Sequence, residues 1–290
     1  MNTAINIQAF FDEESHTVTY LVSDPKTKQA AVIDPVLDYD HASGTVSTTS
    51  ADTVLKSALE QKLTIIWILE THAHADHLSA AVHIQKLTGA QIAIGEHIKD
   101  VQKIFAEKFN QPHISTQGIE FDKLLADGEE IMLGQIPIKV IHTPGHTPAC
   151  VSYHIENAVF VGDTLFMPDY GTARADFPGG DAKKLYRSIQ KLFALPEETI
   201  LYMCHDYKAP GRDHYAWETT VAEARSSNIH VHEGVTEEQF VTMRKQRDAG
   251  LAAPKLLLPS IQVNIQAGEF PEPESNGTQY LKIPLSFKTK

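Results

Sequence analysis

The feature that most constrains this chain is a short segment carrying three histidines and one aspartate, Thr71-His72-Ala73-His74-Ala75-Asp76-His77. Imidazole and carboxylate groups are ligands that first-row transition metals prefer. Alternate residues of an extended segment point the same way, so His72 and His74 can face one ion. A polar loop with Asp76 as a helix N-cap would account for the carboxylate alone, whereas three neighbouring histidines indicate metal binding. The segment therefore predicts a metal site where a strand ends and a helix begins.

Three more side chains of the same kinds follow apolar runs later in the chain. His146 lies in a Pro-Gly turn after one run, Asp163 follows the second, and His205 follows the third. Such runs are typical of buried strands, and a rigid sheet can aim the residues just past its strands at one point. We therefore expect these three residues to join the first segment in one metal site.

The ordered set His-x-His-x-Asp-His, then His, Asp and His, resembles the metallo-β-lactamase superfamily over about residues 5 to 225. The resemblance implies an α/β fold, an αββα sandwich of two packed mixed sheets flanked by helices, with the metal at one edge. A chain of 290 residues, 42% of them hydrophobic, is long enough to bury the core of such a fold. We expect residues 1–225 to form the catalytic domain, and residues 226–290 to form a C-terminal helix and an irregular extension packed on the same domain.

Charge and cysteine content argue against several classes of protein. The formal net charge is −12 and no basic patch is evident in the sequence, which argues against a nucleic-acid partner. The first residues lack the basic and apolar regions of a secretion signal, and no run of 18 apolar residues predicts a membrane span. Two cysteines do not make a disulfide framework. We therefore expect a cytoplasmic protein without a membrane partner, and we leave open a homodimer or higher homo-oligomer.

Residue periodicity predicts the elements that carry these motifs. Strands are expected around a turn at 24–28, and apolar runs precede each metal motif. The expected strands and apolar runs are 17–21, 30–33, 63–69, 91–94, 138–141, 158–161 and 199–203. The expected helices are 51–61 with Ser50 as N-cap, 78–87, 98–109, 182–193, and 236–248 with a capping box from Thr236 to Gln239. Residues 41–50 and the last 30 residues are expected to be irregular.

The residue types permit two arrangements of metal. The first is a dinuclear hydrolase, in which a metal-bound hydroxide attacks an ester, amide or phosphodiester. Its first ion would be bound by His72, His74 and His146. Its second ion would be bound by Asp76, His77 and His205, and Asp163 would bridge the two.

The second arrangement is a mononuclear iron enzyme with open coordination positions for O2, substrate or water. Its only metal ligands would be His72, His146 and Asp163. The remaining residues of the set would then orient those ligands through hydrogen bonds, and they are His74, Asp76, His77 and His205. Residue types alone leave both arrangements open.

Two further motifs resemble the persulfide dioxygenase branch of the superfamily, Arg174-Ala175-Asp176-Phe177 and His205-Asp206-Tyr207. Members of that branch use one ferrous ion, Fe(II), to oxidise glutathione persulfide with O2 to sulfite and glutathione. The resemblance implies that the iron ligands and catalytic residues are His72, His146 and Asp163. It implies that Arg174 and Tyr207 contact glutathione. The chain departs from animal members in an inserted Met-Pro-Asp-Tyr and in Thr172, where they carry cysteine, and its tail after residue 225 resembles a bacterial subgroup.

Two other functions stay open. A glyoxalase-II-like thioesterase would use two Zn ions, or a mixed Zn/Fe pair, to cleave S-lactoylglutathione. Against it, the basic C-terminal glutathione-binding stretch of those enzymes is not evident in this sequence. A non-catalytic metal-binding or sulfur-sensing protein is a different class, and it would not need open coordination positions at the metal.

The remaining histidines and the cysteine beside His205 carry less information. His83 is interpreted as a packing residue, and His142 as a residue that supports a ligand. His230 and His232 have His-x-His spacing without a partner motif, so we interpret them as structural or exposed. Cys204 lies in an apolar run, and free cysteine in such a run is usually a small buried hydrophobe.

Overall fold

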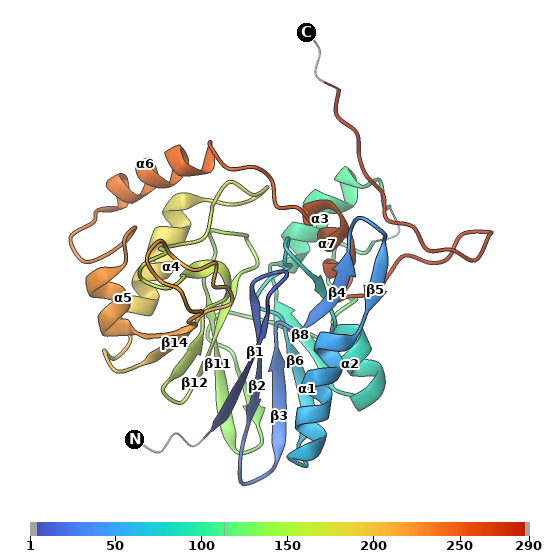
Figure 1. The fold of residues 1–290 in the computed structure, drawn as a ribbon, viewed down its shortest axis with the longest axis horizontal. Coiled ribbons are helices and arrows are strands. Elements are labelled where there is room, and N and C mark those ends of the chain that lie inside the picture. Colours follow the sequence, from blue (N-terminus) through green and yellow to red (C-terminus); the bar gives the residue numbers. More distant parts are fainter. Residues whose placement is uncertain (1–4, 113, 288–290) are drawn as a thin grey trace.

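Two six-stranded mixed sheets form the centre of the computed structural model, which describes residues 5–112 and 114–287 (Figure 1). In spatial order, the first sheet contains β1 (Asn6–Asp12), β2 (Thr17–Ser23), β3 (Gln29–Ile33), β6 (Thr64–Leu69), β8 (Gln91–Gly95) and β9 (Lys123–Leu125). The second contains β10 (Glu130–Leu133), β11 (Ile136–His142), β12 (Val151–Ile155), β13 (Ala158–Phe160), β14 (Ile200–Tyr202) and β15 (Glu218–Thr220). Neighbours from β3 to β9 run parallel, as do β13 and β14, and the other neighbours in these sheets are antiparallel.

The sheets pack face to face through a shared apolar layer. Strand β2 contributes Val18, Tyr20 and Val22 to this layer, and the second sheet contributes residues such as Val140 and Phe160. Because side chains alternate across a strand, Leu21 of β2 points to the opposite face, where it joins a second apolar layer. Every residue of β2 is buried, which is expected of a strand covered on both faces.

Helices cover the outer face of each sheet. On the first sheet lie α1 (Thr49–Glu60), α2 (Ala81–Thr88), α3 (Ile98–Lys108) and α7 (Leu257–Asn264). On the second lie α4 (Ala182–Phe193), α5 (Val221–Ser227) and α6 (Glu237–Asp248). The layers are therefore helix, sheet, sheet and helix, and the predicted αββα sandwich is confirmed.

Three element predictions were wrong in detail. Residues 41–50 are not all loop, because β4 (Val36–Asp40) and β5 (Thr45–Ser47) form a hairpin, with β7 (Leu78–Ser79) on the other edge of β4. A helix was predicted at 78–87, but Leu78 and Ser79 pair with β4 as a strand, so α2 begins at Ala81. Ser50 is not an N-cap, since α1 begins one residue earlier and the Ser50 hydroxyl donates to Asp38 at 2.6 Å.

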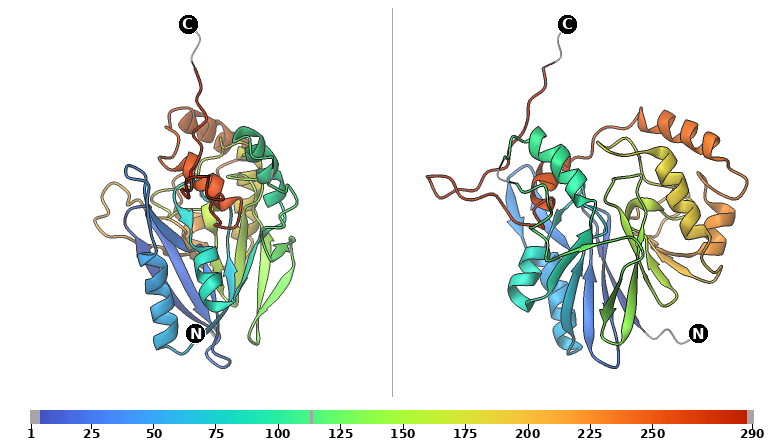
Figure 2. Two further views of the ribbon diagram at one scale, coloured as in Figure 1. Left: turned by 90° about the vertical axis from the view of Figure 1, so that its right-hand side faces the viewer. Right: turned by 180° about the vertical axis from the view of Figure 1, so that it is seen from behind.

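The chain after residue 225 reaches both sides of the sandwich. Helix α6 packs on the second sheet and α7 on the first, and the residues between them cross from one side to the other (Figures 1 and 2). The expectation of an irregular last 30 residues was wrong for its start, because α7 extends to Asn264. The predicted capping box of α6 is confirmed at Thr236 and Gln239. None of the helices in the described part of the chain has the length and apolar character that crossing a bilayer requires.

Candidate metal centre

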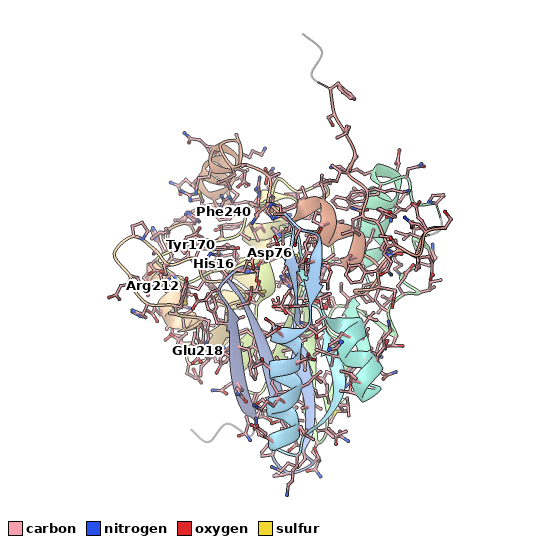
Figure 3. All side chains as sticks on the ribbon, turned by 45° about the vertical axis from the view of Figure 1, so that its right-hand side comes forward. His16, Asp76, Tyr170, Arg212, Glu218 and Phe240 are labelled. Atoms are coloured by element: carbon pink, nitrogen blue, oxygen red, sulfur yellow. The ribbon has the colours of Figure 1, made fainter. Side chains whose placement is uncertain are left out.

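All the ligand-type side chains predicted from the sequence lie at one edge of the sandwich, just past the ends of strands. On the first sheet, the turn after β6 carries His72, His74, Asp76 and His77. On the second sheet, the residues that follow β11, β13 and β14 are His146, Asp163 and His205, and Asp163 lies in the short helix η1 (Gly162–Thr164). An antiparallel bridge between Thr17 and His205 joins the two sheets at this edge. Figure 3 shows Asp76, Tyr170 and His16 at this same end of the molecule.

One cluster contains His72, His146 and Asp163. Their ligand atoms all lie within 4.8 Å of one another. Oδ2 of Asp163 is 3.5 Å from Nε2 of His146 and 3.9 Å from Nε2 of His72. All three residues are buried, yet His146 and Asp163 line a pocket, so the cluster has one side open to a small molecule.

The second nitrogen of each histidine in this cluster is held by a neighbouring oxygen. Nδ1 of His146 lies 2.8 Å from the backbone carbonyl oxygen of Arg174. A carbonyl can only accept, so Nδ1 carries the proton and the Nε2 lone pair is left facing Asp163. Nδ1 of His72 lies 3.0 Å from the Thr71 hydroxyl. Burial and the nearby imidazole of His74 lower the pKa of His72 well below its ordinary value, so this ring is neutral at physiological pH, as a metal ligand must be.

A second cluster surrounds Asp76. Its Oδ2 lies 3.1 Å from Nδ1 of His77 and 3.5 Å from Nε2 of His205, and it accepts a hydrogen bond from the Thr17 hydroxyl at 3.1 Å. Nε2 of His205 also lies 3.3 Å from Oδ1 of Asp163, so the two clusters touch through that carboxylate. Burial acts to raise the pKa of Asp76, but His205 and His77 outweigh it, and the pKa lies well below its usual value.

His74 faces inward as well as toward the metal site. Its Nε2 lies 3.0 Å from Oδ1 of Asp34 and 3.6 Å from Oε2 of Glu70. Burial and the charge of Asp34 raise the pKa of Glu70 well above its usual value. The structure thus gives His74 two buried acidic partners on one side, and its Nδ1 remains available on the other.

Several buried polar atoms in the two clusters have no hydrogen-bond partner in the described part of the chain. They are Nε2 of His72, His77 and His205, both ring nitrogens of His74, and Oδ1 of Asp163. Buried polar atoms are normally paired, and unpaired ones that converge from several elements are explained by a metal ion. Nitrogen and carboxylate donors suit iron or zinc, so the residues present fit one or two such ions.

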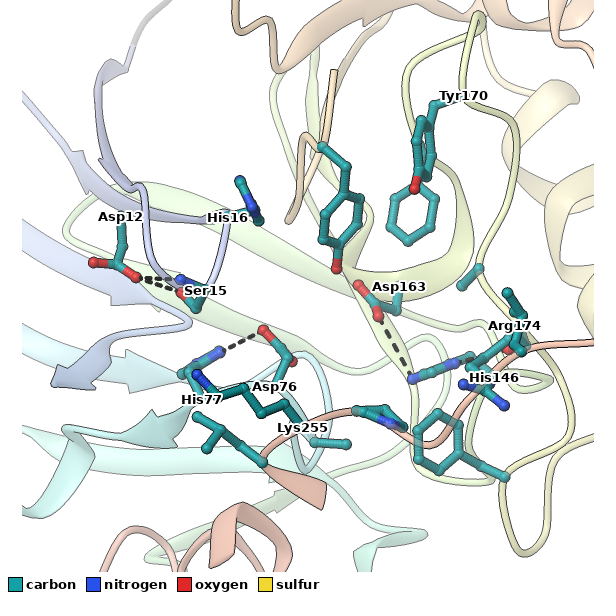
Figure 4. A pocket seen from close by; sticks show the side chains of 18 of the residues that line it. Asp12, Ser15, His16, Asp76, His77, His146, Asp163, Tyr170, Arg174 and Lys255 are labelled. Atoms are coloured by element: carbon teal, nitrogen blue, oxygen red, sulfur yellow. Dashed lines mark hydrogen bonds and ion pairs between the residues drawn. The ribbon is translucent and has the colours of Figure 1, made fainter. Parts of the chain in front are cut away.

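A pocket of about 400 Å³ opens beside the two clusters (Figure 4). Aromatic side chains form much of its wall, and they are Phe166, Tyr170, Phe177 and Tyr207. The Tyr207 ring stacks on the His205 ring at 5.6 Å, and burial with the charges of Asp76 and Asp163 raises the pKa of its hydroxyl well above the usual value. Tyr207 therefore presents a neutral hydroxyl on the wall of the pocket, which is compatible with its predicted substrate contact.

Arg174 also lines the pocket, but its guanidinium is already paired. Its Nε and Nη2 donate to the two oxygens of Asp176 at 2.6 and 2.8 Å, and its Nη1 donates to the carbonyl of Ala252 at 2.7 Å. A substrate carboxylate would have to displace Asp176 to bind this fork. Two other cations on the pocket wall, Arg247 and Lys255, make no ion pair or side-chain hydrogen bond within the described residues.

A model of the metallo-beta-lactamase superfamily matches residues 12–205, which include all seven ligand-type residues. The chain belongs to this superfamily. It is therefore a metal-dependent enzyme of the metallo-beta-lactamase fold, with a metal-binding site made of histidine and aspartate side chains.

Relatives within the superfamily carry different names. Glyoxylase B2 of Dictyostelium discoideum is 49% identical over 99% of this chain and 99% of its own. The human mitochondrial persulfide dioxygenase ETHE1 is 29% identical over 91% of this chain and 89% of its own. The crystal structure of ETHE1 from Myxococcus xanthus matches 91% of this chain and all of its own with a TM-score of 0.74 and 32% identity. The chain spans 64% of the length of a beta-lactamase hydrolase-like protein from Xylella fastidiosa, with 49% identity.

Two of the remaining histidines and Cys204 have different surroundings in the structure. His230 was interpreted as structural or exposed, and the structural alternative agrees with its place, because it is buried on the pocket wall and its Nδ1 accepts the Thr172 N–H at 3.0 Å. His142 was interpreted as supporting a ligand, but its Nε2 bonds to the carbonyl of Pro148 and its ring stacks on His97. The buried state predicted for Cys204 is confirmed.

Three further residues near the site differ in how far the sequence indicates them. Asp34 directly follows the strand predicted at 30–33, and that pattern places it near the predicted site; in the structure its Oδ1 lies 3.0 Å from Nε2 of His74. Asn264 and Arg244 come from the C-terminal helices, far from the motifs in sequence, and no local pattern marks them.

Proposed function

We propose that the chain is a persulfide dioxygenase, which oxidises glutathione persulfide at one ferrous ion held by His72, His146 and Asp163. One geometric observation carries this proposal. Two imidazole nitrogens and one carboxylate oxygen meet beside an open pocket, the donor set typical of mononuclear non-haem iron oxygenases. The likeness to ETHE1 of Myxococcus xanthus over the whole of that chain supports it, because human ETHE1 is named a persulfide dioxygenase.

The proposed reaction balances without a further reductant. Glutathione persulfide, O2 and one water give glutathione, sulfite and two protons. The outer sulfur loses four electrons, and O2 takes them up as the sulfur–sulfur bond breaks. Bound ferrous iron would supply the open positions at which the terminal sulfur and O2 are brought together.

The residues of the chain would bind and orient the substrate. The carbonyl of Arg174 keeps the proton of His146 on Nδ1, so Nε2 stays free to bind metal. Aromatic rings on the pocket wall, including Tyr170 and Tyr207, would exclude water from the sulfur. Arg247 and Lys255 are the cations of the wall that make no ion pair with any described residue, and they suit the carboxylates of a glutathione-type substrate.

A side-by-side assay tests the proposal. Full-length protein is purified and loaded with ferrous iron under nitrogen, and O2 uptake and sulfite formation are then measured with glutathione persulfide. We expect O2 uptake that requires the persulfide, with one sulfite formed per O2, and none in the His146→Ala variant. Iron-loaded protein that takes up no O2 would contradict the proposal.

A glyoxalase-II-like thioesterase is the second candidate, and two observations favour it. Among the residues that the structure describes, Nε2 of His77 and Nε2 of His205 have no hydrogen-bond partner and are buried beside Asp76, so a second metal position is also available. Glyoxylase B2 of Dictyostelium discoideum is 49% identical to the chain. The expected lack of a basic C-terminal stretch no longer counts against this candidate, because Arg244, Arg247 and Lys255 from that region line the pocket. Rapid hydrolysis of S-lactoylglutathione under nitrogen, without O2 uptake, would establish it.

A further inference from the structure

We propose that the C-terminal segment, residues 226–287, positions the candidate metal ligands by hydrogen bonds to the backbone near them. Asn264 holds the turn after β6, and Arg244 with Asp248 holds the loop that fixes His146. These are positioning residues, since none of them belongs to either metal cluster. The proposal concerns the geometry of the metal centre and holds for either reaction considered above.

Asn264 lies on α7 and bonds to three backbone groups of the turn that carries the first histidines. Its Nδ2 donates to the carbonyls of His74 and His77 at 2.9 and 2.8 Å. Its Oδ1 accepts the Ser79 N–H at 2.8 Å. Asn264 is only 4% exposed, so water has little access to these groups. One side-chain amide thus satisfies three backbone groups of the turn, and losing it would leave buried polar groups unpaired.

Arg244 and Asp248 lie at the end of α6 and form a buried ion pair at 2.7 Å. Each also bonds to the loop that follows η1. Nη1 of Arg244 donates to the Thr172 carbonyl at 3.0 Å, and Oδ2 of Asp248 accepts the Ala175 N–H at 2.9 Å. The two contacts lie on either side of Arg174 in the sequence.

The position of Arg174 in this loop connects the ion pair to the metal centre. The carbonyl of Arg174 is the group that accepts the Nδ1–H of His146. Because Arg244 and Asp248 hold the residues on both sides, they fix the direction in which that carbonyl points. They would therefore set the tautomer and ring orientation of His146 without touching it.

The need for such positioning follows from the architecture. The first group of candidate ligands belongs to the first sheet, and His146, Asp163 and His205 belong to the second. Helix α7 packs on the first sheet and α6 on the second, and Arg247 of α6 lines the pocket together with Pro254 and Lys255, which lie between the two helices. One continuous segment therefore contacts both halves of the metal centre and borders the space between them.

The chain offers a matched control for Asn264. Gln262 lies on the same helix, is fully buried, and also bonds to backbone groups, namely the carbonyl of Leu258 and both the N–H and carbonyl of Lys282. Those groups lie away from the metal centre. Asn264→Ala and Gln262→Ala therefore remove a buried amide from one helix, but only the first releases the turn that carries His74 and His77.

The experiment measures metal affinity and geometry in the full-length variants. Each is loaded with Co²⁺, its visible absorption spectrum is recorded, and its metal affinity is found by competition with a chelator; urea unfolding of the metal-free proteins gives their stability. We expect Asn264→Ala to weaken metal binding about 10- to 100-fold and to change the cobalt spectrum. Gln262→Ala should keep metal affinity within about twofold of wild type and leave the cobalt spectrum unchanged, even if it lowers the free energy of unfolding. Equal weakening by the two, or none by Asn264→Ala, would overturn the proposal for α7.

A second pair of variants tests the α6 contacts. If Asn264→Ala does not fold, this pair still tests whether the C-terminal segment positions the metal ligands. Arg244→Lys keeps the charge but loses the guanidinium fork that reaches both Asp248 and Thr172. Its control is Arg187→Lys, which alters the ion pair between Arg187 of α4 and Glu237 of α6, outside the pocket. We expect weaker cobalt binding and an altered spectrum only in Arg244→Lys. Wild-type affinity and spectrum in that variant would overturn the proposal for α6.

Discussion

At the scale of single residues, the groups that each histidine ring nitrogen faces determine whether that histidine can bind metal. The rings of His72 and His74 are both buried and close together, with centroids 4.0 Å apart. His72 directs its free Nε2 toward Asp163, whereas His74 directs one nitrogen toward Asp34 and Glu70. The one-metal proposal therefore assigns metal binding to His72 and orientation of the site to His74.

This assignment predicts different results for two alanine variants. His72→Ala should lose bound iron, because it removes one of three ligands. His74→Ala should keep the iron with about 10- to 100-fold weaker binding, the usual effect of losing an orienting residue. Iron content after dialysis against a graded series of chelator concentrations checks both. If His74→Ala loses metal as completely as His72→Ala, His74 is a ligand and the dinuclear arrangement holds.

Arg247 on the pocket wall gives a second residue-scale prediction. Arg247→Ala should lower kcat/KM for glutathione persulfide about 10- to 150-fold, because a charge-assisted hydrogen bond is worth roughly 1.5–3 kcal/mol. Iron content should not change, and a small persulfide without carboxylates should react as before. Arg187→Ala, outside the pocket, is the control. An equal loss for both substrates would assign Arg247 a structural role, and a larger selective loss in Arg174→Ala would restore Arg174 as the carboxylate contact.

Cys150 gives a prediction about pH. Burial raises the pKa of its thiol to about 12, so at pH 8 only roughly one molecule in ten thousand carries the reactive thiolate. The shift favours the folded state below the pKa of an unfolded thiol, and that contribution is lost as pH rises through the folded pKa. Native protein should resist iodoacetamide at pH 8, and Cys150 should react once the chain is unfolded in urea. Mass spectrometry locates the label, and rapid native labelling of Cys150 would contradict its buried position.

At the scale of elements, strand positions were predictable because alternation and apolar runs are local signals. The runs that end at His72, Asp163 and His205 became β6, β13 and β14 with their polar residues at one edge. The start of α2 was missed because it depends on the pairing of β7 with β4, whose residues are about 40 positions apart. The hairpin of β4 and β5 pairs nearby residues, such as Asp40 with Thr45, but the Ser, Thr and Gly residues of this segment were interpreted as a loop. The capping box of α6 was found because both of its partners lie within one turn. The contacts of Asn264 and Arg244 could not be found, since they join segments about 70 to 190 residues apart.

The capping box allows a prediction for α6. Thr236→Ala removes the hydroxyl that accepts the Gln239 N–H, and such a loss typically costs about 1 kcal/mol of unfolding free energy. Thr242→Ala, at an exposed position within the same helix, should cost nothing because alanine is the better helix former. Urea unfolding of the two variants makes the comparison. Equal stability of Thr236→Ala and wild type would show that the cap contributes little in the folded protein.

At the scale of the whole molecule, the metal centre lies where two sheets and the C-terminal segment meet. Phe240 of α6 belongs to the apolar layer on the second sheet, and Val263 of α7 belongs to the layer on the first. We therefore propose that residues 226–287 fold with the catalytic domain as one unit. Metal that binds only the folded chain should then stabilise the entire molecule by mass action.

Metal content of the full chain, purified under nitrogen without added metal, tests the one-metal proposal most directly. We predict one iron per chain in protein that consumes O2 with glutathione persulfide, because His72, His146 and Asp163 alone are assigned as ligands. Substituting any of these three by alanine should remove that iron. Two metal ions per active chain, whether two zinc or zinc with iron, would contradict the proposal and favour the dinuclear hydrolase.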